Sequence, residues 1–431
     1  MDTNKKIEWG VGGDKVIWTI VFALSFISIL LIYSSSSTLA FKEKTTNFAF
    51  LIKQVAFVAG GLGIAYGFSR IPLGVYRSLS YFAFWVSVAL MVYTLLFGIE
   101  LNNAKRWMKI GPIQFQTTEI IKITIPLYLA RVLETCKLET FKEYFQKILI
   151  PLGIAFGLII LSSVSAALFV AILSFGILFI AGVKWSHIFK TAGIGGGLLL
   201  IVVVLQLAFN IILIPRLGTA IGRIEEFFQG DMTEQMKEMN VHEKQKLADE
   251  TFQADMARVA VSSVGILGKG PGNSTQRYVL PHPYSDYVYA IIIEEYGLFG
   301  GAIVLMLYIW FLFRCVILVK NCTKKFSALT VVGIGLLITI QAILHILVNV
   351  GIIPVTGHTL PLISYGGTSF LILCSAFGVI LSVSRTIEVT SKKIKGGTST
   401  QIENNNNSTP INNGESAEGK FEIIGANDEF K

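Results

Sequence analysis

Residues 268–297 of this chain read Gly268-Lys-Gly-Pro-Gly-Asn-Ser-Thr-Gln-Arg-Tyr-Val-Leu-Pro-His-Pro-Tyr-Ser-Asp-Tyr-Val-Tyr-Ala-Ile-Ile-Ile-Glu-Glu-Tyr-Gly297. A polar loop rich in glycine and proline leads into an apolar helix, which is expected to begin with Asp286 and to contain Glu294 and Glu295. A carboxylate inside a membrane-spanning segment costs about 2.5–3.5 kcal/mol on insertion scales, so each one needs a partner or a function. The glycines and prolines indicate a backbone of defined shape before the helix. The stretch therefore predicts a site at a membrane surface.

The composition of the whole chain is that of a membrane protein. Hydrophobic residues make up 53% of the 431 residues, charged residues 15%, and the mean hydropathy is +0.63. Water-soluble domains of this length are less apolar, whereas multi-span membrane proteins normally have this composition. We therefore predict an all-α polytopic membrane protein. The net charge of +8 is interpreted by membrane side, and no nucleic-acid partner is expected.

Apolar runs predict about ten transmembrane helices. They lie near residues 16–35, 49–68, 79–98, 119–134, 147–162, 166–183, 192–214, 286–313, 327–349 and 360–384. The run from 147 to 183 is too long for one crossing, and we divide it at Ser162-Ser163-Val164-Ser165. The fourth span is the weakest, because Glu119, Lys122 and Arg131 interrupt it.

Lysine and arginine are concentrated in alternate connectors, which marks those connectors as cytoplasmic. The basic connectors lie near residues 69–78, 135–146, 184–191 and 314–326. This pattern predicts an uncleaved first span, cytoplasmic termini and a long outer loop at about 215–285. The predicted divisions are a cytoplasmic N-terminus at 1–15, a transmembrane domain at 16–385 and a disordered, Asn-rich cytoplasmic tail at 386–431. The sequence of the outer loop between about 217 and 262 predicts one or two amphipathic helices, which would lie on the membrane surface or receive a partner. A solvated loop is the alternative.

A first group of chemically active residues precedes and opens the fourth span. Lys105 and Arg106 are paired cations beside Trp107, a combination that suits a lipid phosphate at the membrane interface. Glu119 and Lys122 are three residues apart and share one helical face. The alternative is an interfacial belt of long side chains together with an ion pair that neutralises itself.

The second group opens the eighth span. On a helix, Asp286 and Glu294 lie along one side, Asp286 at the outer mouth, while Glu295 points nearly opposite. In the alternative interpretation, Asp286 or Ser285 caps the helix, and the two glutamates form ion pairs with Lys122 or Arg131. We favour a functional role for Asp286 and a structural role for Glu294 and Glu295.

The third group covers residues 349–369. Its helix-breaking residues are Gly351, Pro354, Gly357, Pro361, Gly366 and Gly367, which interrupt an apolar run. Irregular backbone at membrane depth is tolerated only where it is buried in protein or lines a cavity. Freed amides, with the hydroxyls of Ser364, Thr368 and Ser369, suit an anionic or sugar group. A kinked hairpin without chemistry is the alternative.

These groups resemble motifs of the SEDS family (shape, elongation, division and sporulation), polytopic membrane proteins that polymerise peptidoglycan. The matching segments are Ala104-Lys-Arg-Trp with Phe115-Gln-Thr-Thr-Glu119, Leu280-Pro-His-Pro-Tyr-Ser-Asp-Tyr-Val-Tyr-Ala with Glu294-Glu-Tyr-Gly297, and Pro354-Val-Thr-Gly-His-Thr-Leu-Pro-Leu-Ile-Ser-Tyr-Gly-Gly-Thr-Ser369. They cover nearly the whole membrane domain in order. The segment Gly270-Pro-Gly-Asn-Ser-Thr-Gln-Arg277 is more similar to the division type (FtsW) than to the elongation type (RodA). The tail and the Pro-His-Pro-Tyr-Ser-Asp variant are similar to division-type members from Bacteroidetes.

The resemblance implies a glycosyltransferase at the outer face of the plasma membrane, at the division septum. Its substrate would be lipid II, with undecaprenyl pyrophosphate released on inversion and Asp286 as the catalytic base. The residues implied to bind substrate are Lys105, Arg106, Trp107, Glu119, Lys122, Arg277, Ser364, Tyr365, Gly366 and Gly367. Those implied to support them are Glu294, Glu295, Pro354 and Pro361. The implied partners are a class B penicillin-binding transpeptidase and other division proteins. No cofactor is certain, and a divalent cation at the pyrophosphate stays open.

Two departures from the family pattern leave alternatives open. The family's Gln-Pro-Ser-Glu is here Gln116-Thr-Thr-Glu119, and its Gln-Pro-Asp segment between the fifth and sixth spans is replaced by Leu161-Ser-Ser-Val-Ser165, which has no carboxylate. A non-catalytic division scaffold is therefore one alternative. An elongation-type polymerase and a lipid II flippase or other transporter are the others, although the chain does not divide into two similar halves as many transporters do.

Overall fold

The computed structural model describes residues 12–35, 46–101, 104–111, 113–209, 252–253, 255–280 and 283–406. The longer helices are α1 (Lys15–Ser35), α3 (Asn47–Arg70), α4 (Leu73–Phe97), α5 (Thr117–Thr135), α7 (Ile150–Ser162), α8 (Val164–Ile180), α9 (Trp185–Phe209), α12 (Val288–Lys320), α13 (Lys325–Asn349) and α14 (Thr368–Asn406). The short helix α6 (Phe141–Tyr144) and a π-helical turn (Phe145–Leu149) lead into α7, and a 3-10 turn covers Gln276–Tyr278. Each of the ten predicted spans thus has a helix at its place in the described residues.

Length and apolar composition make these helices membrane spans. In the described residues, seven segments are long and apolar enough to cross a membrane: α1, α3, α4, Phe141–Ser162, α12, α13 and α14 as far as Val389. Helix α8 is apolar but shorter. The predicted all-α, multi-pass membrane architecture is confirmed.

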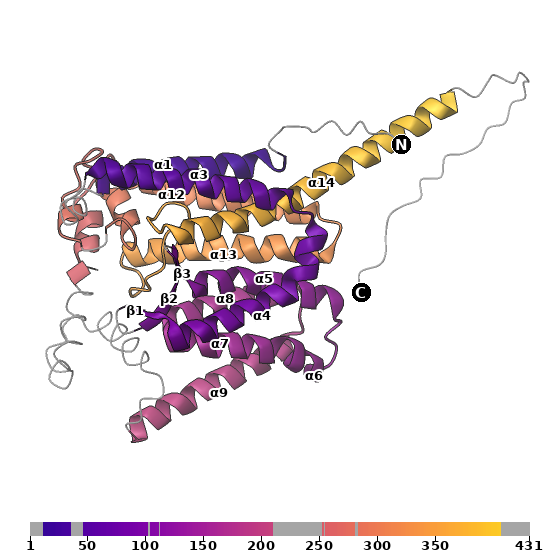
Figure 1. Cartoon of the computed structure of the whole chain (residues 1–431), viewed down its shortest axis with the longest axis horizontal. Helices are drawn as coiled ribbons and strands as arrows, with labels where there is room; N and C mark the ends of the chain where they lie inside the picture. Colours follow the sequence, from indigo (N-terminus) through magenta and orange to yellow (C-terminus); the bar gives the residue numbers. More distant parts are fainter. Residues whose placement is uncertain are drawn as a thin grey trace, which may run out of the picture. The chain divides into compact units, whose positions relative to one another are not determined.

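Helix α13 is at the centre of the main unit, Met1–Ile387. It packs against α12, α5 and α8, while α4 packs against α5, and α1 against α3 and α12 (Figure 1). Buried side chains such as Ile334 and Ile338 of α13 join one hydrophobic core that extends through these helices. The second unit, Glu388–Lys431, contains the end of α14. That helix runs past residue 386, where the sequence predicts the tail to begin, and residues 407–431 lie outside the described residues.

A small sheet connects α4 to α5, which the sequence did not predict. Its strands are β1 (Ile99–Leu101), β2 (Ala104–Ile110) and β3 (Ile113–Gln116), antiparallel and in the order β1-β2-β3. Side chains alternate along a strand, so the adjacent cations at the start of β2 point to opposite faces. Lys105 is exposed, whereas Arg106 is half-buried and Met108 is buried on the inner face.

The predicted division of the long run between residues 147 and 183 is confirmed. Ser163 separates α7 from α8, and its side chain accepts a hydrogen bond from the amide of Ala166 at 3.3 Å, which caps α8. Most of the predicted outer loop lies outside the described residues. The part that is described, 255–280, leads into the site.

Candidate functional site

Asp286 lies in a turn just before α12, not on the helix itself. Residues 283–286 form the turn, Tyr287 is the N-cap residue, and the helix begins at Val288. The predicted alignment of Asp286 with Glu294 along one helix face is therefore wrong, because α12 starts two residues later. The N-cap residue is Tyr287, whose side chain makes no capping hydrogen bond, so neither Asp286 nor Ser285 occupies the N-cap position of the alternative interpretation. The half-buried Asp286 side chain belongs to the turn.

The turn is bonded to the third group through its main chain. The amide of Tyr365 donates to the carbonyl of Tyr284 at 2.9 Å, and the hydroxyl of Ser364 donates to the carbonyl of Ser285 at 2.7 Å. The side-chain amide of Asn349 donates to the carbonyl of Asp286 at 3.1 Å. The last of these bonds joins residues 63 positions apart in the sequence. The second and third sequence groups thus form one unit.

The backbone from residue 350 to 367 is irregular, as the sequence predicts, and its buried part is His358 and residues 360–364. Its polar groups bond within the protein: Tyr308 donates its hydroxyl to the carbonyl of Pro361, and the amide of Leu360 donates to Ser364 at 2.8 Å. Leu362 has a φ of 61°, in the left-handed region that costs an L-residue about 1–2 kcal/mol. A buried leucine held there shows that its surroundings fix the loop. Pro354 is half-buried in the same segment.

The β2 strand brings Arg106, but not Lys105, into the protein. The Nε of Arg106 donates to the carbonyl of Ser162 at 2.8 Å, where α7 ends. Lys105 reaches only the carbonyl of Leu96 at 3.3 Å, on an exposed side. The predicted pair of cations is therefore split: Arg106 lies at the α7–α8 break, and Lys105 and the half-buried Trp107 lie on the other face of the strand.

The α7–α8 break is also bonded to the third group. The hydroxyl of Ser165 donates to the carbonyl of Thr356 at 2.8 Å. At the other end of that group, the hydroxyl of Thr368 donates to the carbonyl of Gln114 on β3 at 2.8 Å. Gly366 and Gly367 lie next to Thr368, and a Cβ on Gly367 would be 3.3 Å from the ring of Phe57. Sheet, break and irregular segment form one framework around the site.

Glu119 and Lys122 form the ion pair of the alternative interpretation. Their charged atoms are 2.6 Å apart, and the side chain of Lys122 is only 2% exposed. Lys122 also donates to the side chain of Gln341 at 3.3 Å, and its Nζ lies 5.3 Å from the centre of the Phe169 ring. A charge this deeply buried must be paired, and here α5, α13 and α8 supply its partners.

Two buried histidines, not selected from the sequence, lie beside this ion pair. The ring of His358 is 5.3 Å from that of Phe169, and its carbonyl bonds the Nδ1 of His345 at 2.7 Å. Burial lowers the pKa of His358 to about 3, and the charges of Lys122 and Arg106 contribute in the same direction. His358 is therefore neutral at physiological pH.

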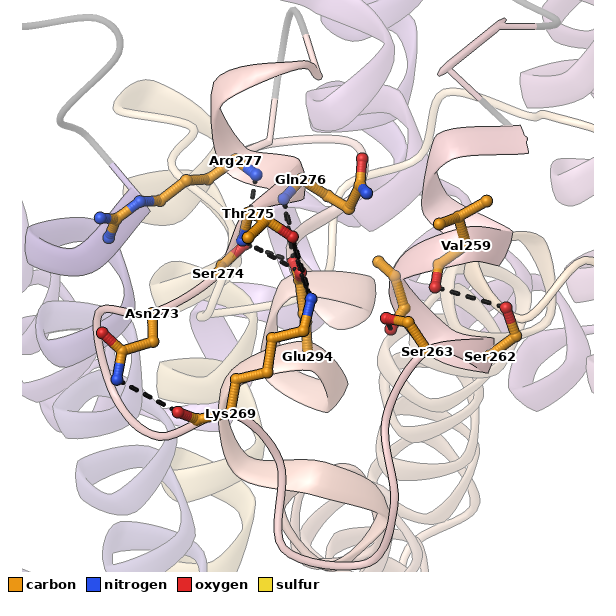
Figure 2. Close-up of polar contacts among 11 residues, drawn as sticks. Val259, Ser262, Ser263, Lys269, Asn273, Ser274, Thr275, Gln276, Arg277 and Glu294 are labelled. Carbon is orange, nitrogen blue, oxygen red and sulfur yellow. Dashed lines mark hydrogen bonds and ion pairs between the residues drawn. The ribbon is translucent and has the colours of Figure 1, made fainter.

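Glu294 does not pair with Lys122 or Arg131, contrary to the sequence-based alternative. Figure 2 shows the loop before the site folded around this carboxylate. Glu294 is fully buried and accepts hydrogen bonds from Lys269 at 2.6 Å, from the amide and hydroxyl of Thr275 at 3.0 and 2.7 Å, and from the hydroxyl of Ser274. The loop is a small anion-binding nest occupied by the protein's own carboxylate.

Glu295 and Arg277 join the same loop to α1. Ser34, at the end of α1, donates its hydroxyl to Glu295 and accepts a bond from Arg277 on its carbonyl at 2.9 Å. The Arg277 guanidinium lies 4.0 Å from Glu295 and donates to the hydroxyl of Tyr278 at 2.6 Å. Arg277, which the resemblance implies to bind substrate, thus contacts α1 through Ser34 and α12 through Glu295.

Helix α12 is broken at Gly297, and the loop fills the break. Gly297 has a φ of 70°, and a Cβ there would lie 2.1 Å from the carbonyl oxygen of Ile266. The amide of Lys269 donates to the carbonyl of Glu294 at 2.9 Å, and that of Phe299 to the carbonyl of Ile266 at 3.3 Å. Backbone groups freed by the kink are thus satisfied by the protein itself, as the membrane interior requires.

The described residues contain no group of three or more His, Cys, Asp or Glu side chains that is arranged to hold a metal ion. The chemical groups at the site are instead a turn carboxylate, two cations at different depths and a framework of protein–protein hydrogen bonds.

Fold and site together define a polytopic helical membrane protein in which Asp286 lies in a turn whose main-chain carbonyls are held by hydrogen bonds. The family model FtsW/RodA/SpoVE, described as "Cell cycle protein", matches residues 14–388. The chain therefore belongs to this family, the SEDS family that its motifs resemble.

Relatives and solved structures agree with this assignment. The chain is 28% identical to the probable peptidoglycan glycosyltransferase FtsW of Coxiella burnetii, over 90% of this chain and 100% of that protein. It is 30% identical to the FtsW of Hydrogenovibrio crunogenus, over 85% and 90%, and 28% identical to the peptidoglycan glycosyltransferase MrdB of Escherichia coli, over 91% and 99%. A chain of a peptidoglycan synthase complex has the same fold, with a TM-score of 0.65, 23% identity and coverage of 86% and 98%. The rod-shape-determining protein RodA of Thermus thermophilus matches with a TM-score of 0.60, 22% identity and coverage of 86% and 97%.

Proposed function

We propose that this chain is a peptidoglycan glycosyltransferase of the FtsW type, which polymerises lipid II at the outer face of the plasma membrane during septal wall synthesis. The observation that carries the proposal is the fixed turn with Asp286 at the start of α12, in a chain that belongs to the family over residues 14–388. Relatives named as peptidoglycan glycosyltransferases cover nearly the whole membrane domain.

The proposed reaction is a displacement at an anomeric carbon. The 4-hydroxyl of the acceptor GlcNAc attacks the anomeric carbon of the donor MurNAc, and the bond from that carbon to the pyrophosphate oxygen breaks with inversion. Asp286 accepts the hydroxyl proton as the new glycosidic bond forms. The electron pair of the broken bond leaves with undecaprenyl pyrophosphate.

The departing pyrophosphate needs positive charge. Arg106, held at the α7–α8 break, and the buried Lys122 supply this charge in the proposal. Preorganised charges in a site with little water stabilise a leaving group more strongly than exposed ones. Lys105 and Trp107, on the outer face of β2, would hold lipid headgroups at the interface. A divalent cation, if one takes part, would share with Arg106 the neutralisation of the pyrophosphate charge.

Several features of the setting also belong to the proposal. Both termini are in the cytoplasm, so that β1–β3 and the turn with Asp286 face outward. A class B penicillin-binding transpeptidase is the partner, together with other division proteins, and the division septum is the site of action. A chain of similar fold is part of a peptidoglycan synthase complex, which supports a partner of this kind.

The test is polymer formation from labelled lipid II by the purified protein, with and without its cognate transpeptidase. The proposal expects glycan strands whose synthesis requires this chain. Lipid II that crosses a vesicle bilayer without being polymerised would instead support the transporter alternative. Binding to the transpeptidase with no polymer under any condition would support a scaffold.

A further inference from the structure

We propose that Asn349 and Ser364 are positioning residues for the Asp286 carboxylate, acting through the main chain of the turn Tyr284–Asp286. This inference rests on the proposed function, in which Asp286 accepts the acceptor's proton. Sequence reasoning gave Asn349 no role and assigned Ser364 to the substrate.

Three consecutive carbonyls of the turn are each held from the same segment of the chain. Tyr284 accepts from the amide of Tyr365 at 2.9 Å, and Ser285 accepts from the hydroxyl of Ser364 at 2.7 Å. Asp286 accepts from the side chain of Asn349 at 3.1 Å. These residues precede the first residue of α12. Their orientation is therefore set by Asn349, Ser364 and Tyr365.

Asn349 joins three elements with one side chain. It is 0% exposed, and its Nδ2 donates to the carbonyls of both Asp286 and His345, the latter at 2.9 Å. Its Oδ1 accepts from the amide of Ala290 at 3.0 Å, one of the amides that a helix start leaves without a helical partner. The end of α13, the turn and the first turn of α12 are thus locked together.

Ser364 uses its hydroxyl in both directions. It donates to Ser285 and accepts from the amide of Leu360 at 2.8 Å. Its single proton is committed to the turn, so it is not available for a substrate. The loop that carries Ser364 is itself fixed, because Leu362 is held at a φ of 61° and is buried. Ser364 is therefore a rigid support for the turn.

This arrangement acts on the placement of the carboxylate and leaves its chemistry unchanged. A misplacement of about 1 Å in a reacting group can lower a rate by about 10²-fold. Since neither Asn349 nor Ser364 is proposed to contact lipid II, removing them should lower kcat and leave KM almost unchanged.

The experiment compares Asn349→Leu and Ser364→Ala with Thr339→Val as the matched control. Thr339 is a buried residue of α13 whose hydroxyl makes no hydrogen bond within the described part of the chain. Each of the two test variants should lose about 10- to 100-fold in kcat on lipid II, with KM changed less than about twofold. The double variant should lose less than the product of the single losses, because both residues hold one turn. Thr339→Val should keep wild-type values.

A second measurement does not depend on lipid II. Hydrogen exchange of the amides in residues 284–290 should become faster in both variants and stay unchanged in Thr339→Val. The inference would be overturned if amide exchange were unchanged, or if KM rose at constant kcat. It would also be overturned if the kcat losses of the two single variants multiplied in the double variant. If Asn349→Leu does not fold, Ser364→Ala decides alone. A wild-type protein that does not polymerise lipid II would contradict the proposed function. The exchange measurement would still test whether Asn349 and Ser364 hold the turn.

Discussion

Replacing Glu294 by alanine should strongly destabilise the loop of residues 268–280 that is hydrogen-bonded to it. The substitution removes the acceptor for Lys269, Ser274 and the amide and hydroxyl of Thr275. The lost bond to the charged lysine costs about 1.5–3 kcal/mol, and the amide and hydroxyl of the exposed Thr275 each lose a bond that is typically about 0.5–1.5 kcal/mol. Relief of the buried carboxylate's own desolvation offsets part of this, so the expected loss is about 3–5 kcal/mol, the range for breaking a buried ion pair.

The assay is thermal unfolding of the purified protein in detergent, together with hydrogen exchange of residues 268–280. Glu294→Gln keeps the shape and an acceptor oxygen, so it should lose only about 1–2 kcal/mol. Asp255→Asn is the control, because that carboxylate pairs with Arg258 at a surface where both side chains are about half exposed, 52% and 46%. Its effect should stay below about 1 kcal/mol. The reasoning would be refuted if Glu294→Ala unfolded at the same temperature as Asp255→Asn and its residues 268–280 exchanged hydrogen no faster than in the wild type.

Three further predictions test other parts of the structure. Gly297→Ala should destabilise the protein by at least about 2 kcal/mol in thermal unfolding. Gly297 has a left-handed conformation, and a Cβ there would lie 2.1 Å from the carbonyl oxygen of Ile266. Wild-type stability of this variant would show that the kink is not needed. Arg106→Gln should lower lipid II turnover by about 10-fold or more, and Lys105→Gln should lower it far less, because only Arg106 enters the protein. Equal losses would contradict the different placement of the two side chains. In a cysteine-free background, Asn273→Cys and Thr323→Cys should react with an impermeant thiol reagent from opposite sides of the membrane, and same-side labelling would reverse the predicted topology.

The spans were predictable because their signal is local. Runs of about 20 apolar residues mark a crossing regardless of what they pack against. The pairing of Glu119 with Lys122 was predictable for the same reason, since residues three apart on a helix are neighbours. Glycines and prolines likewise indicated the irregular backbone between α13 and α14.

The contacts that build the site were not predictable from one sequence, because they are not local. Nothing in the helical pattern says that Glu294 faces its own preceding loop instead of Lys122. The β1–β3 sheet lies in a short connector where polar turn residues mask the alternation, so the opposite directions of Lys105 and Arg106 were missed. An asparagine at a helix end is common, and Asn349 gained a role only when its bond to Asp286 was seen.

The central claim is that Asp286 takes the proton from the attacking hydroxyl. Asp286→Asn keeps the size of the side chain and removes its basic oxygen, and loss of a general base typically lowers a rate by about 10²–10⁴-fold. The half-buried position and the bond from Asn349 to the main-chain carbonyl are unaffected by this change, so folding should be preserved. The deciding measurement is polymerisation of labelled lipid II by purified Asp286→Asn protein of wild-type thermal stability and intact transpeptidase binding. The account predicts a loss within that range, and near-normal polymer from this stable variant would contradict it.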